Sequence, residues 1–291
     1  MEYENPQVPD EVNLPKSHPL ADFSWMLLAV GGATVGVILI LALLADSLVG
    51  YIPFKLEQRL ATTFGLLEDH IPEHHGAGTG TPANAGDNAN QEIQIYLQSL
   101  ADTLIKQDPL PEGMSITVHY RDDGIVNAFA TLGGHIIIHR GLVTRLESEN
   151  ALAMVMAHEI EHIRGRHPIR ATGRGLIITL ALFSITGYSD SSVLDSLVNY
   201  IGFFSTLSFS REHELQADKA ALQLLQHHYG HVLGADQLFE VLKAEGDSEA
   251  FNTFLSTHPL HDVRIDAIKH FNGSDGTSRE LVPLPRALGT H

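Results

Sequence analysis

The pattern His158-Glu159-Ile160-Glu161-His162 combines residue types that can bind a divalent metal and activate water. On an α-helix, residues four apart lie on one face, so the two imidazoles can reach the same ion. Glu159 follows the first imidazole and can serve as a general base for water activated by the metal. Such a short pattern also arises by chance, and two imidazoles alone leave zinc without its usual third protein ligand.

A carboxylate pair farther along the chain can supply the missing ligand. Glu214 and Asp218 are four residues apart, and so they share one face of a predicted helix. Glu214 could bind zinc, while Asp218 could support a ligand imidazole or the motif helix through a hydrogen bond. The alternative is that both residues belong to a solvated helical face, and the neighbouring apolar residues favour the zinc-binding interpretation only slightly.

Several separated segments, HEIEH with IRGRH, SREHELQAD and STHPLHDVRI, resemble the membrane-associated zinc metalloproteases of peptidase family M48. This group includes CAAX prenyl proteases and quality-control proteases of the HtpX, Oma1 and BepA types. The resemblance extends from about Ile116 to Ile268. It implies one zinc ion per chain, with roles for five residues: His158, His162 and Glu214 as ligands, Glu159 as general base and acid, and Asp218 as a support.

The resemblance also implies residues around a peptide-binding cleft. Asn127, Ala128 and Phe129 resemble the family's edge strand, beside which a substrate backbone can pair as an added strand. The resemblance implies that His258 approaches the metal and that Arg264 organises the site, and both are predicted as catalytic because zinc with a positioned His or Arg can stabilise an oxyanion. Some relatives use this His to block the metal at rest, and the sequence leaves both roles open.

An uncharged run of about 20 residues, MLLAVGGATVGVILILALLA, has the length of a membrane-spanning helix. Trp25 and Tyr51 flank it, as interfacial aromatic residues often do. Basic residues on its two sides are nearly balanced, so they do not decide the orientation. The prenyl-protease branch needs several spans, and a single span therefore favours an anchored protease with a water-facing domain.

The chain is expected to consist of five segments. These are a polar N-terminal segment (1–22), a transmembrane anchor (23–50), a connector with a flexible linker (51–90), the metalloprotease domain (91–272) and a loose C-terminal tail (273–291). The expected fold class is α+β, a mainly helical zincin-type domain with a short, mostly antiparallel sheet, preceded by one N-terminal transmembrane helix.

Hydrophobic spacing predicts the elements that carry the candidate site. Helical spacing predicts helices over 91–107, 147–166 and 211–228, and β-branched runs predict strands over 115–121, 125–132 and 135–140. Asp123-Gly124 and Gly133-Gly134 separate the strands and are typical of hairpin turns. Two apolar stretches within 175–209 predict a helical hairpin that covers the domain or dips into the membrane surface.

Composition excludes several classes of function. The 291 residues include 18 Lys+Arg against 35 Asp+Glu, which gives a formal net charge of −17. A chain this acidic repels phosphate backbones, so we expect no nucleic-acid partner. The absence of Cys excludes disulfides, thiolate zinc fingers and a cysteine nucleophile.

These observations predict a membrane-anchored zinc endopeptidase of protein quality control, with unfolded or damaged proteins and the lipid bilayer as partners. The alternative is a catalytically silent chaperone-like or assembly-factor module on the same scaffold, and Glu159 with a complete ligand set favours the enzyme. An aminopeptidase is less favoured, because no acidic cluster is available for an α-amino group. We expect the protein in a bacterial inner membrane with its catalytic domain in the periplasm. The alternative is a catalytic domain on the cytoplasmic side.

Overall fold

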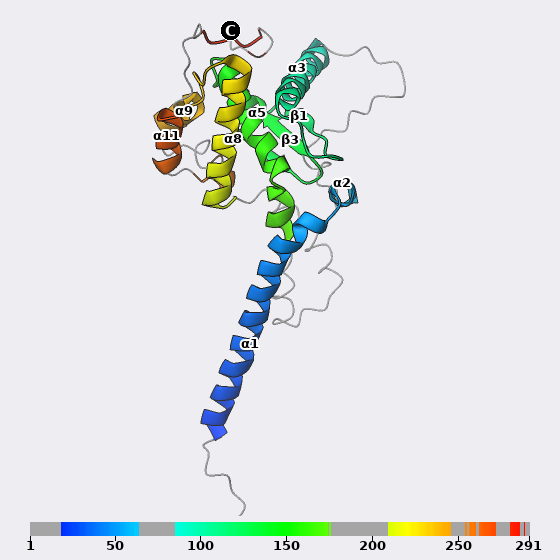
Figure 1. Cartoon of the computed structure of the whole chain (residues 1–291), viewed down its shortest axis with the longest axis vertical. Coiled ribbons are helices and arrows are strands. Elements are labelled where there is room, and N and C mark those ends of the chain that lie inside the picture. Colours follow the sequence, from blue (N-terminus) through cyan, green and yellow to red (C-terminus); the bar gives the residue numbers. More distant parts are fainter. Residues whose placement is uncertain are drawn as a thin grey trace, which may run out of the picture.

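The computed structural model describes residues 19–63, 85–173, 175, 209–245, 254, 256–259, 262–271, 280–285 and 288. A long helix α1 (Pro19–Leu48) and a short 3-10 turn η1 (Val49–Tyr51) lead to helix α2 (Phe54–Thr63), which lies where α1 meets the folded domain (Figure 1). Pro19–Leu41 is exposed, and it is long and apolar enough to cross a membrane. The hairpin expected over 175–209 lies outside the described residues, apart from its two end residues.

Three short strands form a mixed sheet in the order β1 (Thr117–Arg121), β3 (His135–His139), β2 (Ala128–Thr131). β2 and β3 are antiparallel and joined at Gly133-Gly134, where both residues have the positive φ of a tight hairpin turn. β1, however, pairs with β3 in parallel. The α+β class and the mainly helical domain are confirmed, while the sheet is mixed rather than mostly antiparallel.

The hairpin expected at Asp123-Gly124 is therefore wrong. The backbone carbonyl of Asp123 accepts a hydrogen bond from the Gly141 N–H at 3.0 Å, and its carboxylate lies 2.8 Å from His139 Nδ1. These contacts carry the chain from β1 across the end of β3. Turn-forming residues alone do not determine which strand lies next to β1, because that choice depends on the burial of the whole sheet face.

The remaining helices of the domain lie on the sheet or pack on one another beside it (Figure 1). They are α3 (Ala85–Gln107), α4 (Arg140–Val143), α5 (Glu149–Arg164), α8 (Arg211–Tyr229), α9 (Gln237–Glu245) and α11 (Asp262–Lys269). α5 packs against α8 and β2, and nearly all of its residues are buried. α3 begins at Ala85, inside the segment expected to be a linker. The motif helix α5 is thus the central element of the domain.

The first turn of α5 is fixed by two neighbouring helices and by its own N-cap residue. Glu149 accepts hydrogen bonds from the hydroxyls of Tyr96 on α3 and Tyr229 on α8, at 2.7 and 2.9 Å. Ser148 caps the helix by accepting from the Ala151 N–H. These contacts hold the start of the helix in one position relative to α3 and α8.

The described part of the C-terminal segment, which was expected to be loose, is bound to the same end of α5. The Val282 carbonyl accepts from the Glu149 N–H at 2.8 Å, and the Val282 N–H donates to Asn150 Oδ1 at 2.8 Å. Pro283 pairs with Ser148 in an isolated bridge. Composition did not indicate this docking, because backbone groups of the segment make the hydrogen bonds.

Candidate active site

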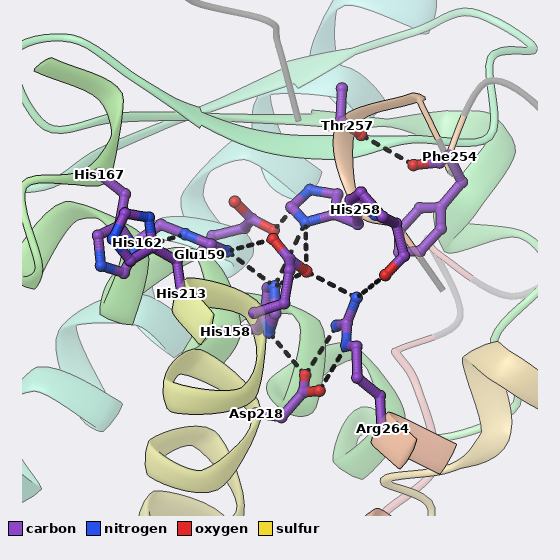
Figure 2. A network of polar contacts seen from close by, with 12 residues as sticks. His158, Glu159, His162, His167, His213, Asp218, Phe254, Thr257, His258 and Arg264 are labelled. Carbon is purple, nitrogen blue, oxygen red and sulfur yellow. Dashed lines mark hydrogen bonds and ion pairs between the residues drawn. The ribbon is translucent and has the colours of Figure 1, made fainter. Parts of the chain in front are cut away.

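Four buried side chains from α5, α8 and a later segment converge on one point (Figure 2). They are His158, His162, Glu214 and His258, whose candidate ligand atoms all lie within 4.8 Å of one another. The Nε2 atoms of His158 and His162 are 2.9 Å apart, as expected for residues one turn apart on a helix. Glu214 lies in the first turn of α8, and its carboxylate oxygens are 3.3 Å from His162 Nε2 and 3.5 Å from His158 Nε2.

This cluster fits one zinc ion. Glu214 Oε1 is buried and accepts no hydrogen bond among the described residues, although His162 Nε2 lies 3.3 Å away. A buried acceptor without a donor is destabilising, and a cation between the imidazoles and the carboxylate would satisfy it. Two imidazole nitrogens and one carboxylate oxygen form a ligand set typical of catalytic zinc.

The electrostatics of the cluster also favour a cation. Burial lowers the pKa of His158, but hydrogen bonds to Asp218 and Glu214 outweigh it and raise that pKa to about 10. Burial holds the pKa of His162 well below its usual value, so this imidazole stays neutral and can act as a ligand. Burial alone would raise the pKa of Glu214, but the surrounding imidazoles, His258 first among them, lower it strongly. Positive charge is therefore favoured at this point.

Asp218 and Arg264 support the ligands from behind (Figure 2). Asp218 Oδ1 lies 2.9 Å from His158 Nδ1, which turns the Nε2 atom of that ring toward the cluster. Arg264 donates to both carboxylate oxygens of Asp218, at 2.6 and 2.9 Å, and its Nη1 lies 2.6 Å from Glu214 Oε2. The guanidinium is 1 % exposed, so it balances two buried carboxylates without contacting solvent.

Glu159 faces the edge strand β2. Its Oε2 accepts a hydrogen bond from the Ala130 N–H at 2.7 Å, and its Oε1 lies 3.4 Å from His258 Nε2. Burial raises the pKa of Glu159, and the neighbouring His258 and His158 oppose that rise. A carboxylate with a raised pKa next to a metal cluster is suited to accept and return a proton.

The segment that carries His258 covers the edge of β2. His258 Nε2 donates to the Ala128 carbonyl at 3.2 Å, so in a neutral ring Nδ1 is the acceptor nitrogen. That Nδ1 faces the cluster, 3.3 Å from His158 Nε2 and 3.4 Å from Glu214 Oε2. Thr257 Oγ1 donates to Asn127 Oδ1 at 3.2 Å. The Ala128 carbonyl, a backbone group of the strand edge that an added peptide strand could use, is thus bonded within the protein.

The structure places the residues selected from the sequence in one region. Asn127, Ala128 and Phe129 are buried at the start of β2, next to the cluster. Two other histidines lie outside the cluster: His135 contacts His119, and His139 contacts Asp123.

Two aromatic contacts of the cluster were missed from the sequence. Phe209 stacks on His162 with ring centroids 3.9 Å apart, and His213 stacks on His167 at the same distance. His167 Nδ1 lies 2.8 Å from His162 Nδ1, so this ring supports a candidate ligand. For Phe209 no spacing pattern exists, because it precedes the helix α8 that carries Glu214.

Comparison with known proteins gives consistent results. The family model described as Peptidase family M48 matches residues 88–272. The mitochondrial metalloendopeptidase OMA1 of Arabidopsis thaliana is 33% identical over 165 residues, which cover 55% of this chain and 32% of that protein. The beta-barrel assembly-enhancing protease of Escherichia coli (strain K12) is 26% identical over 239 residues, covering 71% of this chain and 48% of that protein. The chain spans less than half the length of these relatives.

Proposed function

The chain belongs to peptidase family M48, and from this premise we propose that it is a membrane-anchored, zinc-dependent endopeptidase of protein quality control. The observation that carries the proposal is the buried cluster of two α5 imidazoles and one α8 carboxylate beside Glu159. The names of the similar proteins, a metalloendopeptidase and a protease, support the same activity.

We assign His158, His162 and Glu214 as the zinc ligands. Zinc, when bound, supplies a Lewis acid that polarises a carbonyl and increases the acidity of water. Glu159 accepts the proton of the attacking water and returns it to the leaving amine. The water oxygen adds to the carbonyl carbon, and the C–N bond breaks.

Arg264 contacts Asp218 and Glu214 through its guanidinium. In this proposal it is therefore a positioning residue, in line with the site-organising role that the resemblance implies, rather than an oxyanion partner. Asp218 transmits its effect to the His158 ring, because one carboxylate contacts both the guanidinium and that imidazole.

The substrate is proposed to bind as an added strand along Asn127, Ala128 and Phe129. Support comes from the position of β2 at the edge of the sheet and from the Ala130 N–H, which points at Glu159. Strand addition relies on hydrogen bonds to the substrate backbone and tolerates varied side chains, which suits unfolded or damaged proteins. It requires the segment with Thr257 and His258 to leave the edge first.

In the resting state, His258 is proposed as a fourth residue that would hold zinc. Its Nδ1 belongs to the cluster, and a fourth protein ligand closes the position that catalytic zinc keeps for water or substrate. A closed, four-coordinate site is typical of structural zinc, so hydrolysis would begin only when His258 moves away.

His258→Ala is expected to increase the hydrolysis of a short unstructured peptide, by about tenfold if the closed state prevails by about 1.4 kcal/mol. The peptide should be short, because it must not depend on other substrate contacts. kcat/KM measured with zinc-loaded protein checks this, and His227→Ala is a matched control at an exposed histidine of α8. A large decrease with unchanged zinc content would instead favour an oxyanion role for His258.

Zinc removal tests the proposed activity. Treatment with 1,10-phenanthroline is expected to reduce casein cleavage to the level without enzyme, because the chelator removes the Lewis acid, and added zinc should restore it. The non-chelating 1,7-phenanthroline is the control. Equal cleavage in treated and untreated protein would exclude zinc catalysis, while casein binding without cleavage in every sample would favour the silent assembly-factor alternative.

Membrane anchoring is supported by the exposed apolar helix α1. We further propose a single pass through a bacterial inner membrane with the catalytic domain in the periplasm. The similarity to the Escherichia coli protease and the absence of Cys are compatible with that compartment. Protease digestion of spheroplasts tests the side, because a domain that resists digestion there but is digested in inverted vesicles would contradict it.

A further inference from the structure

Helix α2, which follows the membrane-spanning segment, is fixed to the catalytic domain by a buried ion pair. The Nε of Arg166 donates to Glu57 Oε2 at 2.8 Å, and both of its Nη atoms donate to the Ile52 carbonyl at 3.1 Å. Glu57 is 2 % exposed, and its Oε1 accepts from the Gly133 N–H at 3.2 Å. One arginine and one glutamate thus join the juxtamembrane chain to the turn that follows α5 and to the β2–β3 turn.

Close packing reinforces this attachment. Ala61 of α2 packs with Leu132 and Ile169 in a small apolar core. A Cβ placed on Gly133 would lie 3.1 Å from both the Ala61 Cβ and the Gln58 Cα, so α2 rests directly on the backbone of the turn. The Arg166 guanidinium also lies over the Phe54 ring, 5.5 Å from its centroid. α2 is therefore part of the folded domain rather than a loose tether.

Both attachment points lie close to the candidate active site along the chain. Arg166 follows the ligand His162 by four residues, and Gly133 follows Ala130, whose N–H bonds Glu159, by three. The four residues from His162 to Arg166 span about 6 Å if they are helical and at most about 14 Å if they are extended. With the length of one arginine side chain added, the cluster lies on the order of 20 Å from Ile52.

The membrane surface lies close to the same point. Ile52 follows the end of α1 at Leu48 by four residues, and Asp46 is the first charged residue after the apolar run. Figure 1 shows α2 and the adjoining end of α5 on the side of the domain that faces α1. A chain leaving the same bilayer surface would cross a gap of about 20–25 Å with roughly six to eight extended residues.

We propose, resting on the peptidase function above, that the substrates are membrane-tethered chains cleaved within about ten residues of the bilayer. The docking of α2 through Glu57 and Arg166 sets this distance. A rigid attachment gives a preferred distance, whereas a flexible tether would give only a gradual decline with spacer length. The substrate class is thus an unfolded segment that emerges from the membrane in which the enzyme is anchored.

The test uses the full chain reconstituted in liposomes with a series of single-span substrates. Each substrate carries the same cleavable cassette behind a Gly/Ser spacer of about 5, 10, 20 or 40 residues. We expect cassettes at about 10 residues to be cleaved at least about twentyfold faster than those at about 40, and cassettes at about 5 to be cleaved slowly because five extended residues do not cross the gap. A flexible tether alone would account for only about eightfold between 10 and 40 residues, from the −3/2 power of length.

An insertion between α1 and α2 distinguishes an effect on the distance to the membrane from an effect on catalysis. About 12 Gly/Ser residues inserted between Gly50 and Tyr51 leave Ile52 and α2 in place but lengthen the connection to α1 by up to about 40 Å. The spacer length that gives the fastest cleavage should then increase, and the dependence of the cleavage rate on spacer length should become broader. Hydrolysis of the same cassette as a free soluble peptide should stay within about twofold of the unmodified chain, because the cluster is untouched.

Glu57→Ala is a second variant that loosens α2 without lengthening the chain, and Lys55→Ala is its control at an exposed position of the same helix. Glu57→Ala should flatten the spacer dependence toward the eightfold of a flexible tether, while Lys55→Ala should leave it unchanged. The proposal would be overturned if the cleavage rate of the unmodified chain did not depend on spacer length, or if the insertion did not change that dependence. No cleavage even of the soluble peptide would instead reject the peptidase function itself.

Discussion

Glu159→Gln is expected to lower kcat/KM for peptide hydrolysis by about 10³–10⁴-fold, which corresponds to about 4–5.5 kcal/mol of transition-state stabilisation. The amide can still accept the Ala130 N–H that bonds Glu159 at 2.7 Å, but it cannot take the proton of water. Because Glu159 is not among the candidate ligand atoms of the cluster, zinc content should stay at one ion per chain. Steady-state kinetics with metal analysis of the same sample checks both parts.

A matched control lies two residues further along α5. Glu161 is half-buried and pairs with Arg164 at 2.9 Å, so Glu161→Gln changes the same charge on the same helix without touching the cluster. Its activity should remain within about threefold of the unmodified protein, as expected for a substitution away from the reacting atoms. An empty metal site in Glu159→Gln would contradict the division between base and ligands.

Arg264→Ala is expected to destabilise the domain by about 3–5 kcal/mol in the metal-free state. The substitution leaves the carboxylates of Asp218 and Glu214 buried without their shared guanidinium, whose contacts are 2.6 and 2.9 Å to the first and 2.6 Å to the second. The loss should be smaller with zinc, because the bound cation balances part of the same charge. Urea unfolding with and without zinc measures both values.

Two variants keep this prediction specific. Arg264→Lys retains the charge but cannot donate from two nitrogens to Asp218, so we expect an intermediate loss. Lys269→Ala, on the same helix, removes an exposed pair with Glu240 at 3.8 Å and should cost less than about 1 kcal/mol. An equal, small effect for Arg264→Ala and Lys269→Ala would show that the buried carboxylates do not need the arginine.

The parts of the site that could be predicted from the sequence are those that depend only on the spacing of residues within one helix. His158 and His162 are one helical turn apart, as are Glu214 and Asp218, so each pair had to share a face if its helix formed. The meeting of α5 with α8 could not follow from spacing, because it depends on packing between segments more than 40 residues apart. The order of the family's motifs supplied that information instead.

Contacts between distant charges had no local pattern at all. Glu57 and Arg166 are 109 residues apart, and each looked like an ordinary surface charge in its own segment. The parallel pairing of β1 with β3 was missed for a related reason, since Asp123-Gly124 has hairpin chemistry whatever strand lies beside it. Residues 127–130 were placed in a strand from their β-branched surroundings, but the covering of that strand by His258 depends on the tertiary fold.

The contact of Val282 with the first turn of α5 makes this helix sensitive to changes in the segment that contains Val282. The Val282 carbonyl accepts from the Glu149 N–H and the Val282 N–H donates to Asn150 Oδ1, so a change that displaces Val282 would leave both groups without these partners. Each buried group left without its partner weakens the helix by about 1–3 kcal/mol. Substitutions around Val282 would therefore loosen the helix that carries His158 and His162 without contacting the cluster itself.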